Sequence, residues 1–193
     1  KPSAMKRIAI FASGNGTNAE NIIRYFQASD LDGEVALVIS NNPEAKVIQR
    51  GRNLGVDTKV MTRQEINTPT LMLGLLDEYS IDIIVLAGFM LIIPPFLIER
   101  YPDHIVNIHP ALLPKYGGKG MYGHHVHEAV VAAGEHETGI TVHFVNERYD
   151  EGRIIFQAKT SVTPEDTPAE VEEKIHMLES RHFPRVIAET FFK

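Results

Sequence analysis

The sequence RIAIFASGNGTN, residues 7–18, decides the predicted fold. Residues 7–12 form a nearly continuous apolar run, which is typical of a strand buried on both faces. Gly14 and Gly16 then predict a tight turn, and Thr17 or Asn18 is the expected N-cap of a following helix. The apolar face of that helix consists of Ile22, Ile23 and Phe26. A strand, a glycine-rich loop and a helix in this order are typical of the first unit of a Rossmann-like sheet.

Strand and helix patterns continue to alternate after this unit. Strands are expected at 35–39, 57–60, 81–87 and 105–108, with helices at 45–54, 71–79 and 95–101. In the second half we expect a helix at 125–133, two antiparallel strands at 139–145 and 154–160, and a closing helix at 168–191. Because such alternation implies right-handed crossovers, we predict an α/β fold: a Rossmann-like, mostly parallel twisted sheet with helices on both faces and an antiparallel C-terminal strand pair.

Composition narrows the possible functions. Asp and Glu number 25 against 19 Lys and Arg, and the resulting net charge of −6 argues against binding nucleic acid through a basic surface. The absence of cysteine excludes disulfides, Cys-ligated zinc and thiol nucleophiles. The longest apolar runs, at 83–87 and 90–93, are far shorter than the ~20 residues of a membrane span. No signal-peptide pattern opens the chain, so we expect a cytoplasmic protein without membrane contact.

The glycine-rich loop is the first candidate binding site. Residues 14–19 fit the pattern G-x-G-x-x-A, in which glycines let backbone N–H groups approach a phosphate at a helix N-terminus. A dinucleotide site also needs an acidic residue after the second strand, but residues 39–42 read ISNN. NAD is therefore disfavoured and a mononucleotide-type phosphate is favoured. A tight turn without a ligand is the alternative.

Asn107 and His109 are the second candidate site. Residues two apart in a strand project from the same face, so an amide and an imidazole are expected side by side. An amide N–H can hydrogen-bond an oxyanion while an imidazolium stabilises it and supplies a proton, which suits acyl or formyl transfer. For a single His at a strand end, a structural role is the alternative.

Further candidates surround this pair. Asp150, in the connection between the two late strands, would orient His109 and favour its charged form if it folded back onto it. On local grounds alone, an acidic residue in such a turn is a solvated surface group. Thr141 and His143 alternate on the preceding strand and are expected to support the site from behind.

His124 and His127 have the spacing of a metal-binding pair on a helix. No carboxylate follows them at ligand spacing, and no second His completes a zinc-binding helix pattern. We therefore expect no metal.

Five runs of sequence together resemble one family. They are SGNGTN at 13–18, LAGFM at 86–90, NIHPALLP at 107–114, TGITVHFV at 138–145 and DEG at 150–152. In this order they resemble the folate-dependent formyltransferases, and the Asn-x-His-Pro run followed by a distant Asp is specific to that superfamily. The glycine-rich turn and the absence of an additional domain indicate the members that act on glycinamide ribonucleotide.

The resemblance implies roles for the residues at matching positions. The catalytic residues would be Asn107, His109 and Asp150. The ribonucleotide phosphate and glycinamide would be bound by Gly14, Asn15, Gly16, Thr17, Asn18 and Glu179, with Arg63 as a weaker candidate. The folate would be bound by Met90, Leu91, Ile92, Asn107 and Asp150. Leu91 stands where the family often has Arg, so any contact there with a folate carboxylate must come from elsewhere.

The implied reaction is direct transfer of a formyl group from 10-formyltetrahydrofolate to the amine of glycinamide ribonucleotide, a step of purine (IMP) synthesis. It would take place in a single domain, residues 1–193, with a nucleotide-phosphate-binding half at 5–100 and a catalytic and folate-binding half at 101–193. The expected partners are small-molecule substrates, with no metal and no nucleic acid, and we expect a monomer or a weak homodimer.

Two other classes of function stay open at this point. One is a related folate enzyme, either a hydrolase of formyltetrahydrofolate or a formyltransferase that acts on an aminoacylated RNA. The other is a Rossmann-like module that senses a nucleotide without catalysis. A phosphate-binding module has no use for an oxyanion-stabilising pair such as Asn107 and His109, which favours an enzyme.

Overall fold

The computed structural model describes residues 5–147 and 152–192. This part of the chain divides into two compact units. The first runs to Val106 and includes the chain again from Ile187, and the second is Asn107–Val186. Hydrogen bonding orders the seven strands β3-β2-β1-β4-β5-β6-β7.

The first unit contains a parallel sheet. Its strands are β1 (Lys6–Phe11), β2 (Gly33–Ser40), β3 (Asp57–Val60) and β4 (Ile83–Leu86). β1 pairs in parallel with both β2 and β4, and β2 pairs in parallel with β3. Ile8, Ile10 and Phe11 are fully buried, as expected for a central strand covered on both faces.

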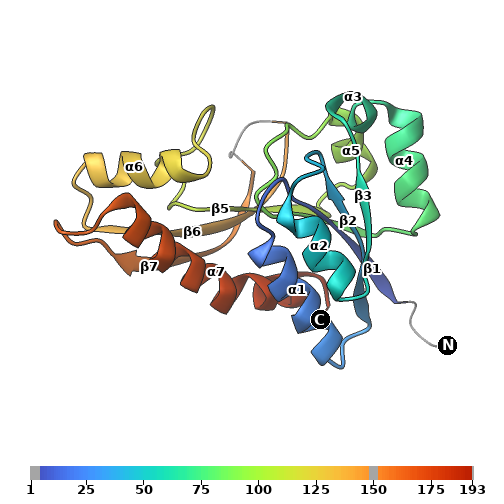
Figure 1. Cartoon of the computed structure of the whole chain (residues 1–193), viewed down its shortest axis with the longest axis horizontal. Coiled ribbons are helices and arrows are strands. Elements are labelled where there is room, and N and C mark those ends of the chain that lie inside the picture. Colours follow the sequence, from blue (N-terminus) through green and yellow to red (C-terminus); the bar gives the residue numbers. More distant parts are fainter. Residues whose placement is uncertain (1–4, 148–151, 193) are drawn as a thin grey trace. The chain divides into compact units, whose positions relative to one another are not determined.

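Helices connect these strands on both faces of the sheet. They are α1 (Thr17–Ala28), α2 (Lys46–Asn53), α3 (Arg63–Ile66), α4 (Pro69–Glu78) and α5 (Pro95–Arg100). The chain moves outward from β1 to β3 and then returns to β4 on the other side of β1. Right-handed crossovers therefore place α1 and α2 on one face and α4 on the opposite face, as Figure 1 shows.

The second unit contains antiparallel strands and two helices. Its elements are β5 (Ile105–His109, which begins in the first unit), α6 (His124–Ala132), β6 (Glu137–Phe144), β7 (Ile154–Ser161) and α7 (Pro168–Phe191, which ends in the first unit). β6 and β7 are antiparallel, and their register places Thr141 opposite Gln157. α7 starts at a capping box, in which Thr167 Oγ1 accepts from Glu170 N and Glu170 Oε1 accepts from Thr167 N. None of the helices in the described ranges is both long and apolar enough to cross a membrane.

The predicted α/β class is confirmed, including the mostly parallel sheet and the antiparallel carboxyl-terminal pair. Two local predictions were wrong. The N-cap of α1 is Gly16, with φ of 80°, in place of Thr17 or Asn18, because the loop turns through a left-handed glycine directly before the helix. The short helix α3 was missed, although Thr62 and Glu65 form a capping box that the sequence pattern could have shown.

Gly16 and Gly74 make a matched pair for a stability measurement. A Cβ at Gly16 would lie 2.6 Å from Val47 Cβ and 2.7 Å from Val47 Cα, at a backbone φ that disfavours other residues. We expect Gly16→Ala to lower the free energy of unfolding by about 2–4 kcal/mol in urea denaturation. A Cβ at Gly74, on α4, would meet no atom within 4 Å, so Gly74→Ala should raise the free energy of unfolding by about 0.5–1 kcal/mol. Equal effects of the two substitutions would contradict this packing.

Candidate active site

The glycine-rich loop of the first unit presents backbone donors at the start of α1. No side chain in the described ranges caps this helix at Gly16, so its first-turn N–H groups are left for other acceptors. Gly14 and Asn15 are exposed, and the loop is therefore accessible. Uncapped N–H groups together with the helix dipole favour an anion at this position.

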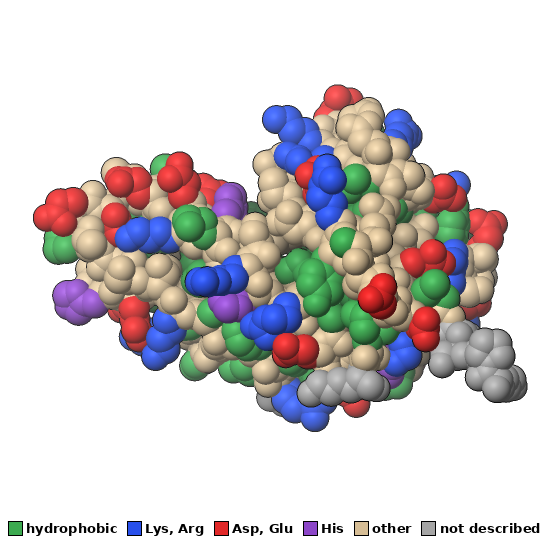
Figure 2. All heavy atoms as spheres, turned by 90° about the horizontal axis from the view of Figure 1, so that it is seen from below, with side chains coloured by type: hydrophobic (Ala, Val, Ile, Leu, Met, Phe, Trp, Pro, Cys, Tyr) green, Lys and Arg blue, Asp and Glu red, His purple; other side chains and the backbone are tan. Residues whose placement is uncertain are grey.

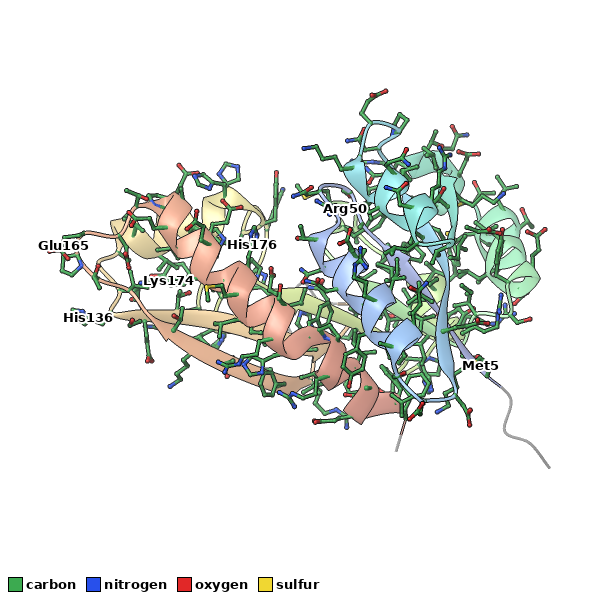
Figure 3. All side chains as sticks on the ribbon, turned by 60° about the horizontal axis from the view of Figure 1, so that its bottom comes forward. Met5, Arg50, His136, Glu165, Lys174 and His176 are labelled. Atoms are coloured by element: carbon green, nitrogen blue, oxygen red, sulfur yellow. The ribbon has the colours of Figure 1, made fainter. Side chains whose placement is uncertain are left out.

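α2 holds this loop from one side. The backbone N of Val47 donates to Gly14 O at 3.2 Å. One helical turn later, Arg50 Nε donates to Asn15 O at 2.6 Å and Arg50 Nη2 to Asn15 Oδ1 at 3.0 Å. Figure 3 labels Arg50 where it reaches the amino-terminal end of α1. The loop geometry therefore depends on α2 as well as on its own glycines.

Ser13 ties the loop to the ends of two further strands. Its N donates to Gly88 O at 3.0 Å, and its Oγ accepts from Met90 N at 2.8 Å. The Ser13 hydroxyl in turn donates to Asn41 Oδ1 at 2.6 Å. Asn41 thus lies in the region where a dinucleotide site would need an acidic residue. Its side-chain carbonyl accepts a hydrogen bond from the loop instead.

The segment 90–92, predicted to bind folate, offers an apolar surface. Met90 and Ile92 are 46% and 65% exposed, and Leu91 is partly exposed. Neighbouring exposed apolar side chains are typical of a surface that takes up a flat organic ligand. The side chain of Leu91 has no donor for a carboxylate.

In the second unit, His143 fixes the amide of Asn107. His143 Nδ1 lies 3.0 Å from Phe144 O, an acceptor, so Nδ1 carries the proton and Nε2 is an acceptor in the neutral ring. Asn107 Nδ2 lies 3.2 Å from His143 Nε2 and donates to it. This bond orients the NH₂ group of Asn107, which has a second N–H to offer elsewhere. The structure therefore gives His143 a direct role in orienting a predicted site residue.

His109 is held by a contact that the sequence did not reveal. Its side chain is 3% exposed, and Nε2 lies 2.7 Å from Tyr116 O, to which it donates. Tyr116 has a positive φ of 58°, which turns its carbonyl back toward the strand end. A carbonyl can accept from the neutral or the protonated imidazole, so this contact is compatible with both forms.

Thr141 and Gln157 hold the loop that follows His109. Thr141 Oγ1 donates to Ala111 O at 2.7 Å and accepts from Leu113 N at 3.0 Å. Gln157 Nε2 donates to Leu113 O at 3.0 Å and to Thr141 Oγ1 at 2.9 Å. Gln157 was not predicted, although its position opposite Thr141 in an antiparallel pair could have indicated it.

The remaining predicted residues differ in their exposure to solvent. Glu179 is 8% exposed on α7, and Arg63 is exposed at the start of α3. Asp150 lies outside the described residues. The roles assigned to these side chains, like those of Asn107 and His109, stay predictions.

His127 is a buried histidine on α6. It is 3% exposed, and its Nδ1 has no hydrogen-bond partner among the described residues. Burial lowers the pKa of His127 to about 4; nearby His124 and His176 act in the same direction and Glu172 opposes them. The ring is therefore neutral at pH 7. Across the described parts of the chain, no group of three or more His, Asp or Glu side chains could hold a metal ion.

Comparison with known proteins shows the family to which the chain belongs. The profile of the formyl transferase family, Formyl_trans_N, matches residues 6–187, and the chain belongs to this family. The predicted resemblance to folate-dependent formyltransferases is confirmed at this level.

Several relatives in this family have the same enzyme name. Phosphoribosylglycinamide formyltransferase from Haemophilus influenzae is 38% identical over 187 residues, covering 95% of this chain and 86% of the relative. The chloroplastic enzyme of the same name from Arabidopsis thaliana is 35% identical over 187 residues, and the match spans 94% of this chain but only 64% of that protein. A crystal structure of glycinamide ribonucleotide transformylase 1 from Geobacillus kaustophilus has a TM-score of 0.86 at 38% identity, with 95% and 97% of the two chains covered.

Two expectations are left open by these comparisons. A cytoplasmic location stays a prediction, since relatives from two plants are named chloroplastic. The monomeric or weakly dimeric state also stays a prediction. On the face drawn in Figure 2, the Lys and Arg side chains of the described residues are interspersed with Asp and Glu, and they form no continuous basic stripe.

Substitutions at Thr141 and Thr138, on the same strand, test whether the hydrogen bonds of Thr141 stabilise the loop after His109. Thr141→Val removes three hydrogen bonds and leaves the buried N of Leu113 without its acceptor, so we expect the free energy of unfolding to fall by about 2–3 kcal/mol. Thr138 is 2% exposed, and its Oγ1 has no partner among the described residues. Thr138→Val should therefore be neutral or stabilising. Urea denaturation measures both; a neutral Thr141→Val would contradict the assigned role.

Because His127 is buried in its neutral form, we expect the protein to lose stability in acid. Its folded pKa of about 4 lies below the ordinary 6.5, so between these values the unfolded chain binds more protons and stability falls as the pH falls. The loss due to this residue is about 3 kcal/mol in total. His127→Gln should remove this pH-dependent loss of stability. The stability advantage of wild type over the variant should therefore shrink as the pH drops from 7 to 4.5. A difference independent of pH would contradict the neutral, buried state.

Proposed function

We propose that this protein transfers a formyl group from 10-formyltetrahydrofolate to the amine of glycinamide ribonucleotide, in purine synthesis. The observation that carries the proposal is the match to relatives named phosphoribosylglycinamide formyltransferase at 34–38% identity over 95% of the chain. The uncapped loop before α1 and the oriented amide of Asn107 are the groups that such a reaction needs.

The substrates would bind to groups already described. The phosphate of the ribonucleotide would lie on the backbone amides of residues 14–17, with Asn18 nearby, where the α1 dipole favours an anion. Glu179 would contact the glycinamide group. The folate would use the apolar surface of Met90 and Ile92. A phosphate held by amides needs little net positive charge, so an overall charge of −6 is compatible with anionic substrates.

The chemistry would be direct transfer. The amine nitrogen of the glycinamide group attacks the formyl carbon, and a new N–C bond forms while the carbonyl oxygen becomes an oxyanion. The Asn107 N–H and protonated His109 would stabilise that oxyanion, since donors aimed at developing charge lower the barrier. The C–N10 bond then breaks, and the proton lost by the attacking amine ends on N10. No covalent enzyme intermediate is needed.

Each supporting contact has a part in this scheme. The bond from Asn107 to His143 prevents the amide from rotating, so its N–H points in a fixed direction. The Tyr116 carbonyl orients the imidazole of His109. Asp150 would favour the protonated form of His109 and assist proton transfer through water. Preorganised donors of this kind do not have to reorganise during the reaction.

The direct test mixes purified protein with both substrates and follows the release of tetrahydrofolate and the formylated ribonucleotide. Release that depends on the ribonucleotide supports the proposal. Release without it would indicate a hydrolase of formyltetrahydrofolate, and absence of release would indicate a binding module. Formylation of an aminoacylated RNA but not of the ribonucleotide would also overturn the assignment.

Substitution of the proposed catalytic residues should reduce turnover selectively. We expect Asn107→Ala and His109→Ala each to lower kcat by about 10²–10³-fold, since each removes a donor to the oxyanion, and Asp150→Asn to lower it severely. Thermal unfolding should show that the variants still fold. His136→Ala, an exposed histidine of the same unit, is the matched control and should leave kcat unchanged. Near-normal kcat in His109→Ala would contradict the mechanism.

A further inference from the structure

We propose that Arg50 is a positioning residue for phosphate recognition: by holding Asn15, it sets the direction of the loop amides that bind the phosphate of the substrate. The inference rests on the proposed function, because it takes the loop at 14–17 as the phosphate site. It adds a residue outside that loop, on α2, whose side chain determines how the loop binds.

The Arg50 guanidinium makes three hydrogen bonds at the start of α1. Nε and Nη2 donate to the backbone oxygen and the side-chain oxygen of Asn15, at 2.6 Å and 3.0 Å. Nη1 donates to Glu20 Oε1, in the first turn of α1, at 3.0 Å. One planar group therefore connects the loop with the helix that follows it. The rigid fork of an arginine can make these bonds together, whereas the single ammonium of a lysine cannot reproduce them.

The bond to the Asn15 carbonyl has a geometric consequence for the next amide. In a trans peptide the C=O and the N–H point in opposite directions. With its oxygen directed to Arg50, the Asn15–Gly16 peptide must direct the Gly16 N–H away from α2. Val47 N has the same effect on the preceding peptide, because it holds Gly14 O and so directs the Asn15 N–H away from α2.

The two contacts from α2 therefore act together. Val47 and Arg50 are one helical turn apart, and they bind two successive carbonyl groups of the loop. The two corresponding N–H groups are left on the opposite side, next to the first-turn N–H groups of α1. Successive N–H groups that converge in this way form a concave anion-binding nest. The glycine at 16 allows the conformation, and Arg50 stabilises it.

Arg50 also determines the charge beside the nest. Hydrogen bonds from Arg50 first, and from Arg24 second, lower the pKa of Glu20, so this carboxylate is ionised. The Arg50 and Glu20 side chains are 29% and 27% exposed. Their charges offset each other, so Arg50 acts by geometry and by neutralising Glu20. Without Arg50, the Glu20 carboxylate would lie in the first turn of α1 with Arg24 as its remaining ion-pair partner among the described residues, and it would repel a phosphate.

The test measures the Michaelis constants of both substrates for Arg50→Gln and Arg50→Lys. We expect Arg50→Gln to raise KM for glycinamide ribonucleotide by about 10–100-fold, the range for losing charged hydrogen bonds. Because the formyl donor binds elsewhere, its KM and the kcat should change by less than about threefold. Arg50→Lys should resemble Arg50→Gln more than wild type. Arg52→Gln is the matched control on the same helix, where the side chain contacts Thr58 Oγ1 at 3.2 Å, and it should behave as wild type.

A second measurement uses inorganic phosphate, which has no formyl chemistry. Phosphate should inhibit competitively against the ribonucleotide, and titration of the protein with phosphate should show weaker binding to Arg50→Gln than to wild type or Arg52→Gln. Adding Glu20→Gln to Arg50→Gln should recover part of the lost affinity, since it removes the repelling carboxylate. No recovery would assign the whole loss to the orientation of the amides.

Three outcomes would overturn the inference. They are an unchanged KM for the ribonucleotide in a folded Arg50→Gln protein, equal losses in kcat and in the KM of both substrates, and a loss of the same size in Arg52→Gln. If the wild-type protein does not formylate the ribonucleotide, the proposed function fails. The phosphate titration then decides on Arg50 alone, because weaker phosphate binding in Arg50→Gln than in Arg52→Gln supports its positioning role and equal binding overturns it.

Discussion

The two hydrogen bonds of the Ser13 hydroxyl group hold together the segments that follow three strands of the first unit. Parallel strands bring their carboxyl ends to one edge of a sheet. There Ser13, two residues after β1, hydrogen-bonds to Asn41 after β2 and to Met90 after β4. Three segments far apart in the sequence are thereby fixed to one another. The glycine-rich loop and the apolar surface at 90–92 thus share a common support, although neither contains a regular element. In the second unit, Thr141 does the same for the loop after β5.

Much of the fold could be predicted from the sequence, because its patterns are local. The apolar run at 7–12 and the helical spacing of Ile22, Ile23 and Phe26 identified β1 and α1, and the alternation after Gly139 identified the antiparallel pair. The start of α1 was misjudged since threonine and asparagine are usual caps, and nothing local shows that Gly16 packs against Val47. α3 was missed because it is only one turn long.

For the candidate site, the sequence named residues whose roles stay predictions, and it did not show their hydrogen-bond partners. Asn107 and His109 lie at the end of β5, where the two-residue period of a strand placed them. Their contacts with His143 and Tyr116 depend on strand pairing and on a left-handed turn, which no local pattern encodes. The same holds for Arg50, because the sequence predicted a helix at 45–54 but not the contact of this side chain with Asn15. The link from Asp150 to His109 stays a prediction, since Asp150 lies outside the described residues.

The start of α1 has a consequence for the coupling between ligand binding and folding. α1 begins after Gly16 without a side-chain cap, and a glycine at this position forgoes a few tenths of a kcal/mol of the stabilisation that a capping side chain provides. An anion accepting from the first-turn N–H groups would supply that stabilisation itself. Saturation with a phosphate ligand would then raise the melting temperature of the protein. In this respect the ligand completes the helix, as a capping residue does in other proteins.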